Sequence, residues 1–183
     1  MQRKSTTVLV LISIALTSAF AGNNPKVGGK EMYPTKNIIE NAVNSADHTT
    51  LVSAVKAAGL VDTLEGAGPF TVFAPTNQAF GKLPRGTVET LLKPENKLQL
   101  TKVLTYHVVA GRLSSRDLMK MIQDGSGSAE LTTVEGGKLW ARIHDGKHIM
   151  LRDEKGGAAL VTIANVFQSN GVIHVIDTVL MPN

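Results

Sequence analysis

The spacing of apolar residues changes about two thirds of the way along the chain, and this change restricts the fold more than any other feature. Up to residue 124, apolar side chains recur mainly every three or four positions, which is the spacing of amphipathic helices. After residue 128 they fall into short runs separated by glycine-rich turns, a pattern typical of antiparallel strands. Helices segregated from a run of strands predict a domain of the α+β class.

The helical part contains start and stop signals. Thr76 is expected to cap a short helix, and Ser114 begins a sequence that resembles a capping box. Asp47 or Thr49 can cap another helix, and Gly59 suits the left-handed residue after its end. The expected helices cover residues 38–43, 51–58, 76–80, 94–104 and 114–122.

One strand is expected inside the helical part, because residues 70–74 are apolar on both faces and Pro75 ends the run. A short strand pattern follows at 106–109. Asp145 and Gly146 predict a two-residue hairpin loop in the later part. The expected strands of that part cover residues 131–134, 139–144, 148–152, 160–167 and 172–180.

The amino terminus has the pattern of a secretory signal peptide over residues 1–21. Arg3 and Lys4 precede a short apolar stretch, and residues 19–21 form a small-x-small cleavage site. The alternative is a membrane anchor, but the stretch is shorter than the roughly 20 residues that span a bilayer. Residues 22–36 then read as a flexible tether, and residues 37–183 as a single domain.

Composition excludes several classes of protein. The chain has no cysteine, so disulfides, thiolate metal sites and thiol catalysis are absent. Without Arg3 and Lys4 the 19 basic residues fall to 17, against 15 acidic ones. No basic cluster with stacking aromatics occurs, so no nucleic-acid partner is expected. No segment after the leader is apolar enough to span a membrane.

Three segments resemble the signature blocks of fasciclin (FAS1) domains. They are GPFTVFAPTNQAF at 68–80, LTYHVVAG at 104–111 and SNGVIHVIDTVLMP at 169–182. All three occur in the family's order, so the chain is identified as a member of the fasciclin family, of the single-domain bacterial type. The motif positions singled out as structural are Thr71, Phe73, Pro75, Thr76, Tyr106, His107, Asn170, Gly171, His174 and Asp177.

The resemblance implies a fold and a general role. The fold is a compact α+β wedge, a twisted β-sandwich of about seven strands with helices packed along one edge. The implied role is non-enzymatic cell adhesion or surface contact, periplasmic or extracellular, with a protein or polysaccharide partner. A monomer without a cofactor is expected.

The residues that could take part in catalysis or metal binding are predicted to have structural roles instead. His107 and His174 are predicted to bond nearby backbone or hydroxyl groups, because no acidic cluster of catalytic type lies in either block; a metal or acid–base pair is the alternative. Asp177 is predicted to be a hydrogen-bonding hub. His144 and His148 would point to opposite faces across a two-residue loop, and would oppose each other and could share a metal across a three-residue loop.

Three classes of function remain to be distinguished. A surface interaction module is favoured, and Phe80, Leu83, Leu91 and Leu92 would supply its contact patch if they are exposed rather than core. A carrier or sensor of a small apolar or sugar ligand is the alternative and requires a pocket. An enzyme is disfavoured, because neither a Gly-x-Ser-x-Gly elbow nor a phosphate-binding loop occurs.

Overall fold

The computed structural model of the protein describes residues 24–183. The predicted signal peptide at 1–21 and the predicted mature terminus at Gly22 lie outside the described residues. Within the described part, the helices and strands follow one another in the order that the apolar spacing predicts, helices mainly first and strands mainly last.

The predicted flexible tether is wrong for residues 24–36. Strands β1 (Lys26–Val27) and β2 (Lys30–Glu31) form a small hairpin, and Val27 and Met32 are buried in the domain. Gly28 packs so closely that a Cβ there would lie 2.6 Å from the Ser45 hydroxyl. The glycines and prolines of this segment therefore form a turn that packs against the domain, and the side chains of Val27 and Met32 hold it in place.

Helices fill most of residues 38–124. The Thr76 hydroxyl caps α4, Ser114 and Asp117 form the predicted capping box of α7, and Gly59 ends α2 in the left-handed conformation. Neither Asp47 nor Thr49 caps α2; the N–H of Thr50 instead donates to Asn77 Oδ1 at 3.0 Å. The helices are α1 (Ile38–Ala42), η1 (Ala46–His48), α2 (Thr49–Ala58), α3 (Val61–Glu65), α4 (Asn77–Gly81), α5 (Thr87–Leu91), η2 (Pro94–Asn96), α6 (Lys97–Tyr106) and α7 (Ser115–Asp124).

Seven strands form one mixed sheet in the order β4-β3-β9-β8-β7-β6-β5. A bridge between Val109 and Thr133 connects the two ends of this order, so the sheet is nearly a closed barrel. The two layers of the expected sandwich are thus parts of one curled sheet, joined through the long, bulged β8. The strands are β3 (Phe70–Pro75), β4 (Val108–Ala110), β5 (Ala129–Thr132), β6 (Lys138–His144), β7 (His148–Arg152), β8 (Ala158–Gln168) and β9 (Gly171–Ile176).

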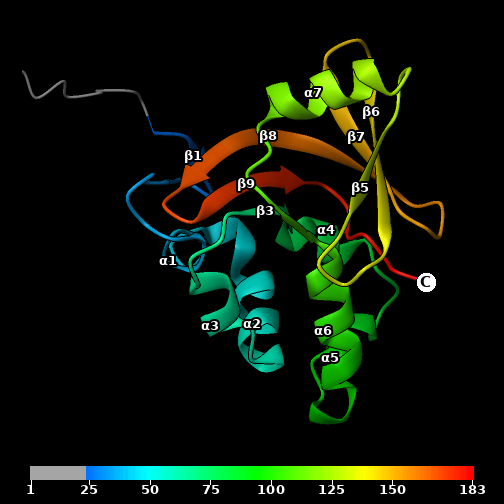
Figure 1. Ribbon diagram of the computed structural model, residues 1–183. Helices are drawn as coiled ribbons and strands as arrows, with labels where there is room; N and C mark the ends of the chain where they lie inside the picture. The colour runs from blue at the N-terminus through cyan, green and yellow to red at the C-terminus, as the bar shows by residue number, and fades with distance from the viewer. Residues whose placement is uncertain (1–23) are drawn as a thin grey trace, which may run out of the picture.

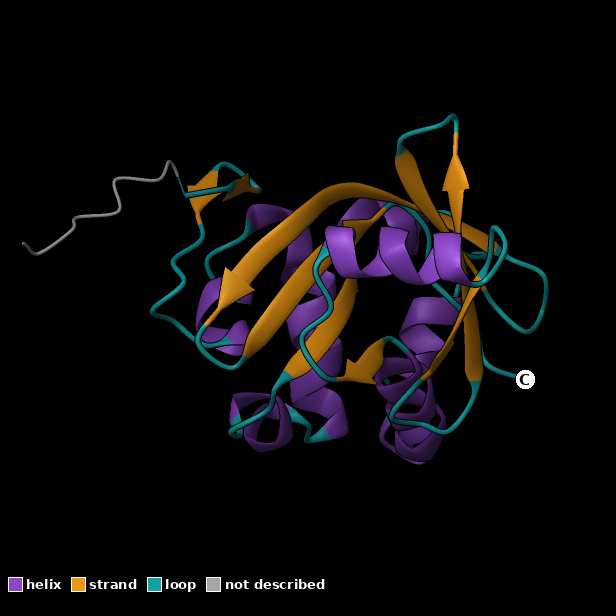
Figure 2. Cartoon of the chain, turned by 45° about the horizontal axis from the view of Figure 1, so that its top comes forward, coloured by secondary structure: helices purple, strands orange, loops and turns teal. Residues whose placement is uncertain are grey.

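Two apolar cores lie on the two faces of this sheet. Helices α1 to α6 cover one face of β3 and β9, and α7 lies on the opposite side, as Figures 1 and 2 show. The first core joins the helices to β3 and β9. The second core lies inside the curled sheet, where α7 covers β5 and β6. The α+β class and the sheet of about seven strands are confirmed, while α7 lies apart from the helices that pack on the other side of the sheet.

Several local assignments differ from the sequence pattern: the strand expected at 106–109 starts at Val108, with Tyr106 still in α6, and the strand expected at 131–134 lies at Ala129–Thr132. Leu98 lies within the helix expected over residues 94–104, but its side chain is 87 % exposed, because α6 starts at Lys97 and its first turn projects beyond the core. The strand expected over 172–180 ends at Ile176, so Asp177 lies just after β9 rather than within it.

Candidate functional site

Two fully enclosed histidines connect the strands to the segments around them. His107 follows α6; its Nδ1 lies 2.8 Å from the Val103 carbonyl oxygen, and its Nε2 accepts from the Leu180 N–H at 3.0 Å. On β9, His174 Nε2 lies 2.8 Å from the Leu113 carbonyl oxygen, and its Nδ1 accepts from the Asn165 N–H. Each ring therefore acts as one donor and one acceptor, which only the neutral imidazole provides.

Burial makes protonation of these rings unfavourable. It lowers the pKa of His107 to about 4 and lowers that of His174 as well, although in each case the hydrogen bond to a carbonyl opposes the effect. Neutral rings with both nitrogens engaged cannot also act as an acid–base pair without breaking the connections they make.

Acid should destabilise the protein through His107. A histidine whose pKa is lowered on folding contributes stability that is complete above its unfolded pKa of 6.5 and is lost as the pH falls toward about 4. We expect the free energy of unfolding to fall by on the order of 3 kcal/mol from this residue over that range. Urea titrations between pH 7 and 4.5 measure it, and His107→Gln should flatten the slope. An equal slope in the variant would contradict the assignment.

Asp177 joins the end of β9 to β8 and α4. Its Oδ1 accepts from the N–H of Leu160 at 2.8 Å and from the hydroxyl of Thr178, and its Oδ2 lies 3.1 Å from Lys82 Nζ. Burial would raise the pKa of Asp177, but the Leu160 N–H and the Lys82 ammonium outweigh it, so the pKa is lowered. The carboxylate serves as an acceptor for groups on three segments.

Asp177→Asn should lower stability modestly. The side chain is 38 % exposed, so screening limits its ion pair, and we expect a loss of about 0.5–1 kcal/mol. Because the pKa is lowered, the contribution is present above about pH 4 and disappears as the pH falls below it. Thermal melts at pH 7 and pH 3 test this; an unaltered melting temperature at pH 7 would contradict the hub role.

The other motif positions lie in β3, at the start of α4 and at the end of α6. Thr71 Oγ1 donates to the Gly111 carbonyl and accepts from the Leu113 N–H, and Phe73 stacks on His174 with ring centroids 5.8 Å apart. Tyr106 Oη donates to the Lys138 carbonyl at 2.6 Å, and burial raises its pKa to about 12. Pro75 ends β3 and Thr76 caps α4. The motif thus consists largely of residues whose polar atoms already have partners inside the fold.

Asn170 lies in the turn between β8 and β9, and Gly171 is the first residue of β9. The Asn170 amide accepts from the Ile38 N–H and donates to the carbonyls of Leu64 and Gly66. At Gly171 a Cβ would lie 2.3 Å from the Phe70 carbonyl oxygen, so only glycine lets β3 approach this closely. The turn therefore holds α1 and the end of α3 against the sheet.

The loop between β6 and β7 differs from the two-residue prediction. His144 pairs with His148, so Asp145, Gly146 and Lys147 form a three-residue loop. The reason is that Asp145 and Gly146 both take positive φ, and the Lys147 N–H then bonds back to His144. His148 Nδ1 contacts the Asp145 carboxylate at 2.7 Å. Among residues 24–183, no group of three or more His, Asp or Glu side chains is arranged to hold a metal.

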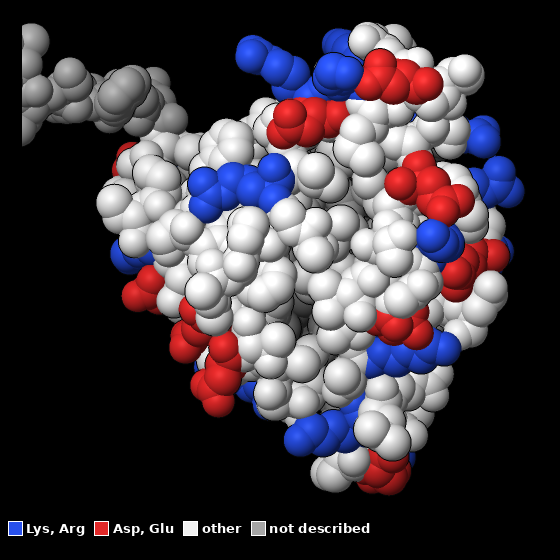
Figure 3. Space-filling model, in the orientation of Figure 1, with Lys and Arg blue, Asp and Glu red and all other residues white. Residues whose placement is uncertain are grey.

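Charged side chains are scattered over the surface shown in Figure 3. Basic and acidic residues alternate around an uncharged centre, without a large area of one sign on this face. This distribution does not resemble the continuous basic surface of nucleic-acid-binding proteins.

A groove runs between α5, α6 and the carboxyl-terminal segment. It consists of two hollows of about 380 and 360 Å³ that share Gln99 and Met181 in their walls. Arg85 lies at one end, and Lys102 and Lys155 lie at the other. The rest of the groove is lined by threonine, amide and aliphatic side chains. The described lining residues include no Asp or Glu. The remaining lining residues are Gly86, Thr87, Thr90, Leu91, Asn96, Leu98, Val103, Pro182 and Asn183.

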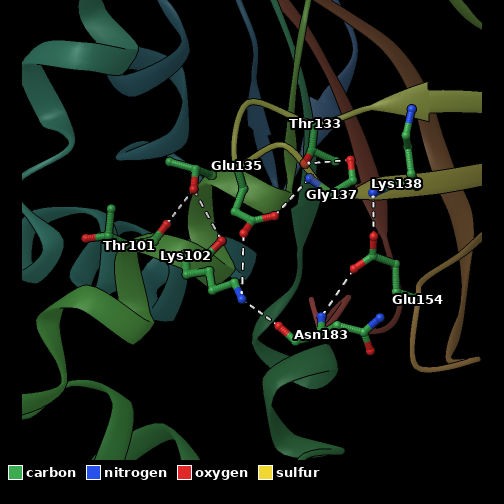
Figure 4. Close-up of polar contacts among 9 residues, drawn as sticks. Thr101, Lys102, Thr133, Glu135, Gly137, Lys138, Glu154 and Asn183 are labelled. Atoms are coloured by element: carbon green, nitrogen blue, oxygen red, sulfur yellow. Dashed lines mark hydrogen bonds and ion pairs between the residues drawn. The ribbon is translucent and has the colours of Figure 1, made fainter.

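A polar network, which we call the Lys102 corner, supports one end of this groove (Figure 4). Lys102 Nζ reaches the main-chain oxygen of Asn183 and lies 3.7 Å from Glu135. Glu135 in turn accepts from the N–H of Gly137, and Glu154 accepts from the N–H groups of Lys138 and Asn183. The network anchors the carboxyl-terminal segment between α6 and the β5–β6 turn.

The contact patch expected from the sequence is mostly core. Phe80 and Leu91 are buried, while Leu83 and Leu92 are partly buried against the first core. The exposed apolar residue of this region is instead Leu98. The basic residues of the groove, Arg85, Lys102 and Lys155, are far apart in the sequence and form no cluster there, so no sequence signal marked the groove, whose arrangement depends on how α5 and α6 pack.

Comparison with known proteins settles the family. The sequence model of the fasciclin domain matches residues 46–182, well over half of the chain. The chain belongs to the fasciclin domain family. The resemblance inferred from the three motifs is therefore confirmed.

Relatives of this fasciclin domain occur in bacteria. Protein sll1483 of Synechocystis sp. is 41 % identical over 94 % of this chain and 96 % of that protein. Immunogenic protein MPB70 of Mycobacterium bovis is 38 % identical over 77 % of the chain and 66 % of its own length. Cell surface glycolipoprotein MPB83 of the same species is 37 % identical over 89 % of the chain and 69 % of its own length.

A solved structure shares the fold. The FAS1 domain pair of the insect cell adhesion molecule Fasciclin I superposes with a TM-score of 0.72 at 21 % identity, over 81 % of this chain and 51 % of that one. Among the described helices of this fasciclin domain, none is long and apolar enough to cross a membrane.

Proposed function

We propose that the protein is exported and acts outside the cytoplasm as a non-enzymatic module for adhesion or surface interaction. The leader pattern at residues 1–21 supports export. Members of the fasciclin family are generally adhesion or surface proteins. The groove between α5, α6 and the carboxyl-terminal segment is the observation that carries the proposal.

The polar residues of the motif blocks favour binding over turnover. His107, His174 and Tyr106 engage backbone groups with all their polar atoms, and Asp177 bonds Leu160, Thr178 and Lys82. Catalysis requires a base or nucleophile free to meet a substrate. In this domain these groups instead hold the scaffold that positions the groove.

The groove fits an acidic, extended segment of a partner protein. Arg85 and Lys155 make no ion pair with another residue of the described chain, so both are free to meet carboxylates. Leu98 and Met181 between them offer apolar contact for intervening side chains, and Gln99 offers an amide to a partner backbone. Electrostatic complementarity of this kind directs association and fixes orientation.

A hollow at the amino-terminal hairpin is a weaker candidate. It has a volume of about 450 Å³ and is lined by Lys26, Lys30 and Lys36 together with the acidic Glu31. Lys36 also lies over the Tyr33 ring at 5.2 Å. A carboxylate within the lining and the lack of aliphatic side chains make it less suited to an acidic partner.

Titration of the ¹⁵N-labelled protein with a synthetic peptide of alternating Glu and Val tests the groove. Amide shifts should concentrate at Arg85, Gln99 and Lys155, and the double variant Arg85→Glu/Lys155→Glu should weaken binding at least tenfold. A parallel titration with polygalacturonate tests a polysaccharide partner. Groove shifts with polygalacturonate and none with the peptide would overturn the protein partner in favour of a polysaccharide.

A matched charge reversal controls for nonspecific attraction. Arg142→Glu/Lys147→Glu makes the same change in net charge on the β6–β7 hairpin, away from the groove. It should leave peptide binding unchanged. An equal loss in both double variants would show that the peptide responds only to net charge, and the groove would not be the site.

A further inference from the structure

A partly enclosed apolar cavity lies inside the first core, away from the groove. Helices α1, α2 and α6 form its walls, and β3 and β9 form its floor. Its volume is about 40 Å³. Figure 3 shows a hollow among uncharged residues at the middle of the face, between the positions of α2 and α6 in Figure 1. Leu51, Val55, Val72, Leu104 and Ile173 are among the lining residues.

The few polar groups in the wall already have partners. Ser45 Oγ lies 2.8 Å from His48 Nδ1, and His48 Nε2 faces the Ala74 carbonyl oxygen at 3.4 Å. The His107 nitrogens both bond backbone groups. An ordered water needs two to four polar partners, and cavities that lack them stay dry. The cavity therefore prefers an apolar occupant.

We propose that this cavity is a binding site for one small apolar molecule, such as xenon, dioxygen or a two- or three-carbon hydrocarbon. The volume is about a tenth of that of either hollow of the groove, so the cavity suits a small molecule rather than a sugar or an acyl chain. The site goes beyond the proposed surface function and does not depend on it.

The amino-terminal hairpin closes the cavity on one side. Val27 and Met32 line it, and two hydrogen bonds between the Asn41 amide and the Tyr33 backbone hold the segment in place. These walls belong to residues 24–45, which lie outside the region that the family model matches. Short elements of this kind open locally at low cost, which provides a route for a small molecule.

Xenon is the probe for this site. In a ¹³C-methyl spectrum of the exported chain, xenon should cause saturable shifts at Leu51, Val55, Val72 and Leu104, and none at Leu118, Leu139 or Leu151 in the second core. Uniform, linear shifts in both cores would mean nonspecific contact and would overturn the site.

A filling variant and a matched control locate the binding. Val55→Leu adds a methylene to the cavity wall, and Val161→Leu makes the same change in the second core, where the valine is equally buried at 5 % exposure. The first should reduce xenon affinity at least fivefold and the second should not. If Val55→Leu fails to fold, Val72→Ile replaces it. Unchanged affinity in a folded filling variant would overturn the proposal.

Discussion

Ile176→Asp should leave the protein unfolded in water. Ile176 is 0 % exposed and lies in β9, between β3 and β8, where its side chain packs in the second core. Burying an unpaired carboxylate lowers the free energy of unfolding by many kcal/mol, and burying the protonated acid still lowers it by several kcal/mol. Domains typically have a free energy of unfolding of only about 5–15 kcal/mol. Circular dichroism and a thermal melt measure the outcome.

The matched control for this substitution is Ala158→Asp. It introduces the same charge at an exposed position of β8 in the same sheet, so we expect a folded protein with nearly unchanged stability. A soluble, cooperatively melting Ile176→Asp protein would show that the centre of the sheet is assigned wrongly.

Asn170→Leu should cause the second largest loss. The amide is nearly fully buried and forms three hydrogen bonds that connect the β8–β9 turn to Ile38, Leu64 and Gly66. Leucine has a similar branched shape but leaves three backbone groups without partners, and we expect a loss of about 3 kcal/mol or more. Urea unfolding provides the free energy.

Asn44→Leu is the control for Asn170→Leu. Asn44 is exposed and its amide makes one bond, to the Glu40 carbonyl, so its replacement should change stability by less than about 0.5 kcal/mol. Equal losses at the two positions would mean that the buried amide does not hold α1 and α3 to the sheet.

Local features of the fold could be predicted because they depend on neighbours in the sequence. The caps at Thr76 and Ser114 and the end of α2 at Gly59 follow from side-chain chemistry within a few residues. The strand at 70–74 was recognisable because it is apolar on both faces. The three motif blocks then identified the family, since each carries residues that this packing requires.

Features that depend on distant partners could not be predicted. The parallel pairing of β3 with β9 joins residues about 100 positions apart, and no local pattern encodes it. The cap of α2 comes from Asn77. Val27 and Met32 are too widely separated in a glycine-rich segment to produce a periodic signal. For the same reason the groove, which combines α5, α6 and the last residues, became visible only in three dimensions.

Photo-cross-linking in intact cells of the protein's own host tests the central claim most directly. A photoreactive residue at Gln99 in the groove should form a protein adduct that disappears in the Arg85→Glu/Lys155→Glu background, whereas the same residue at Arg142 should form none. An adduct formed only from position 142 would contradict the groove as the interaction surface. An adduct at position 99 that persists in the Arg85→Glu/Lys155→Glu background would contradict it as well.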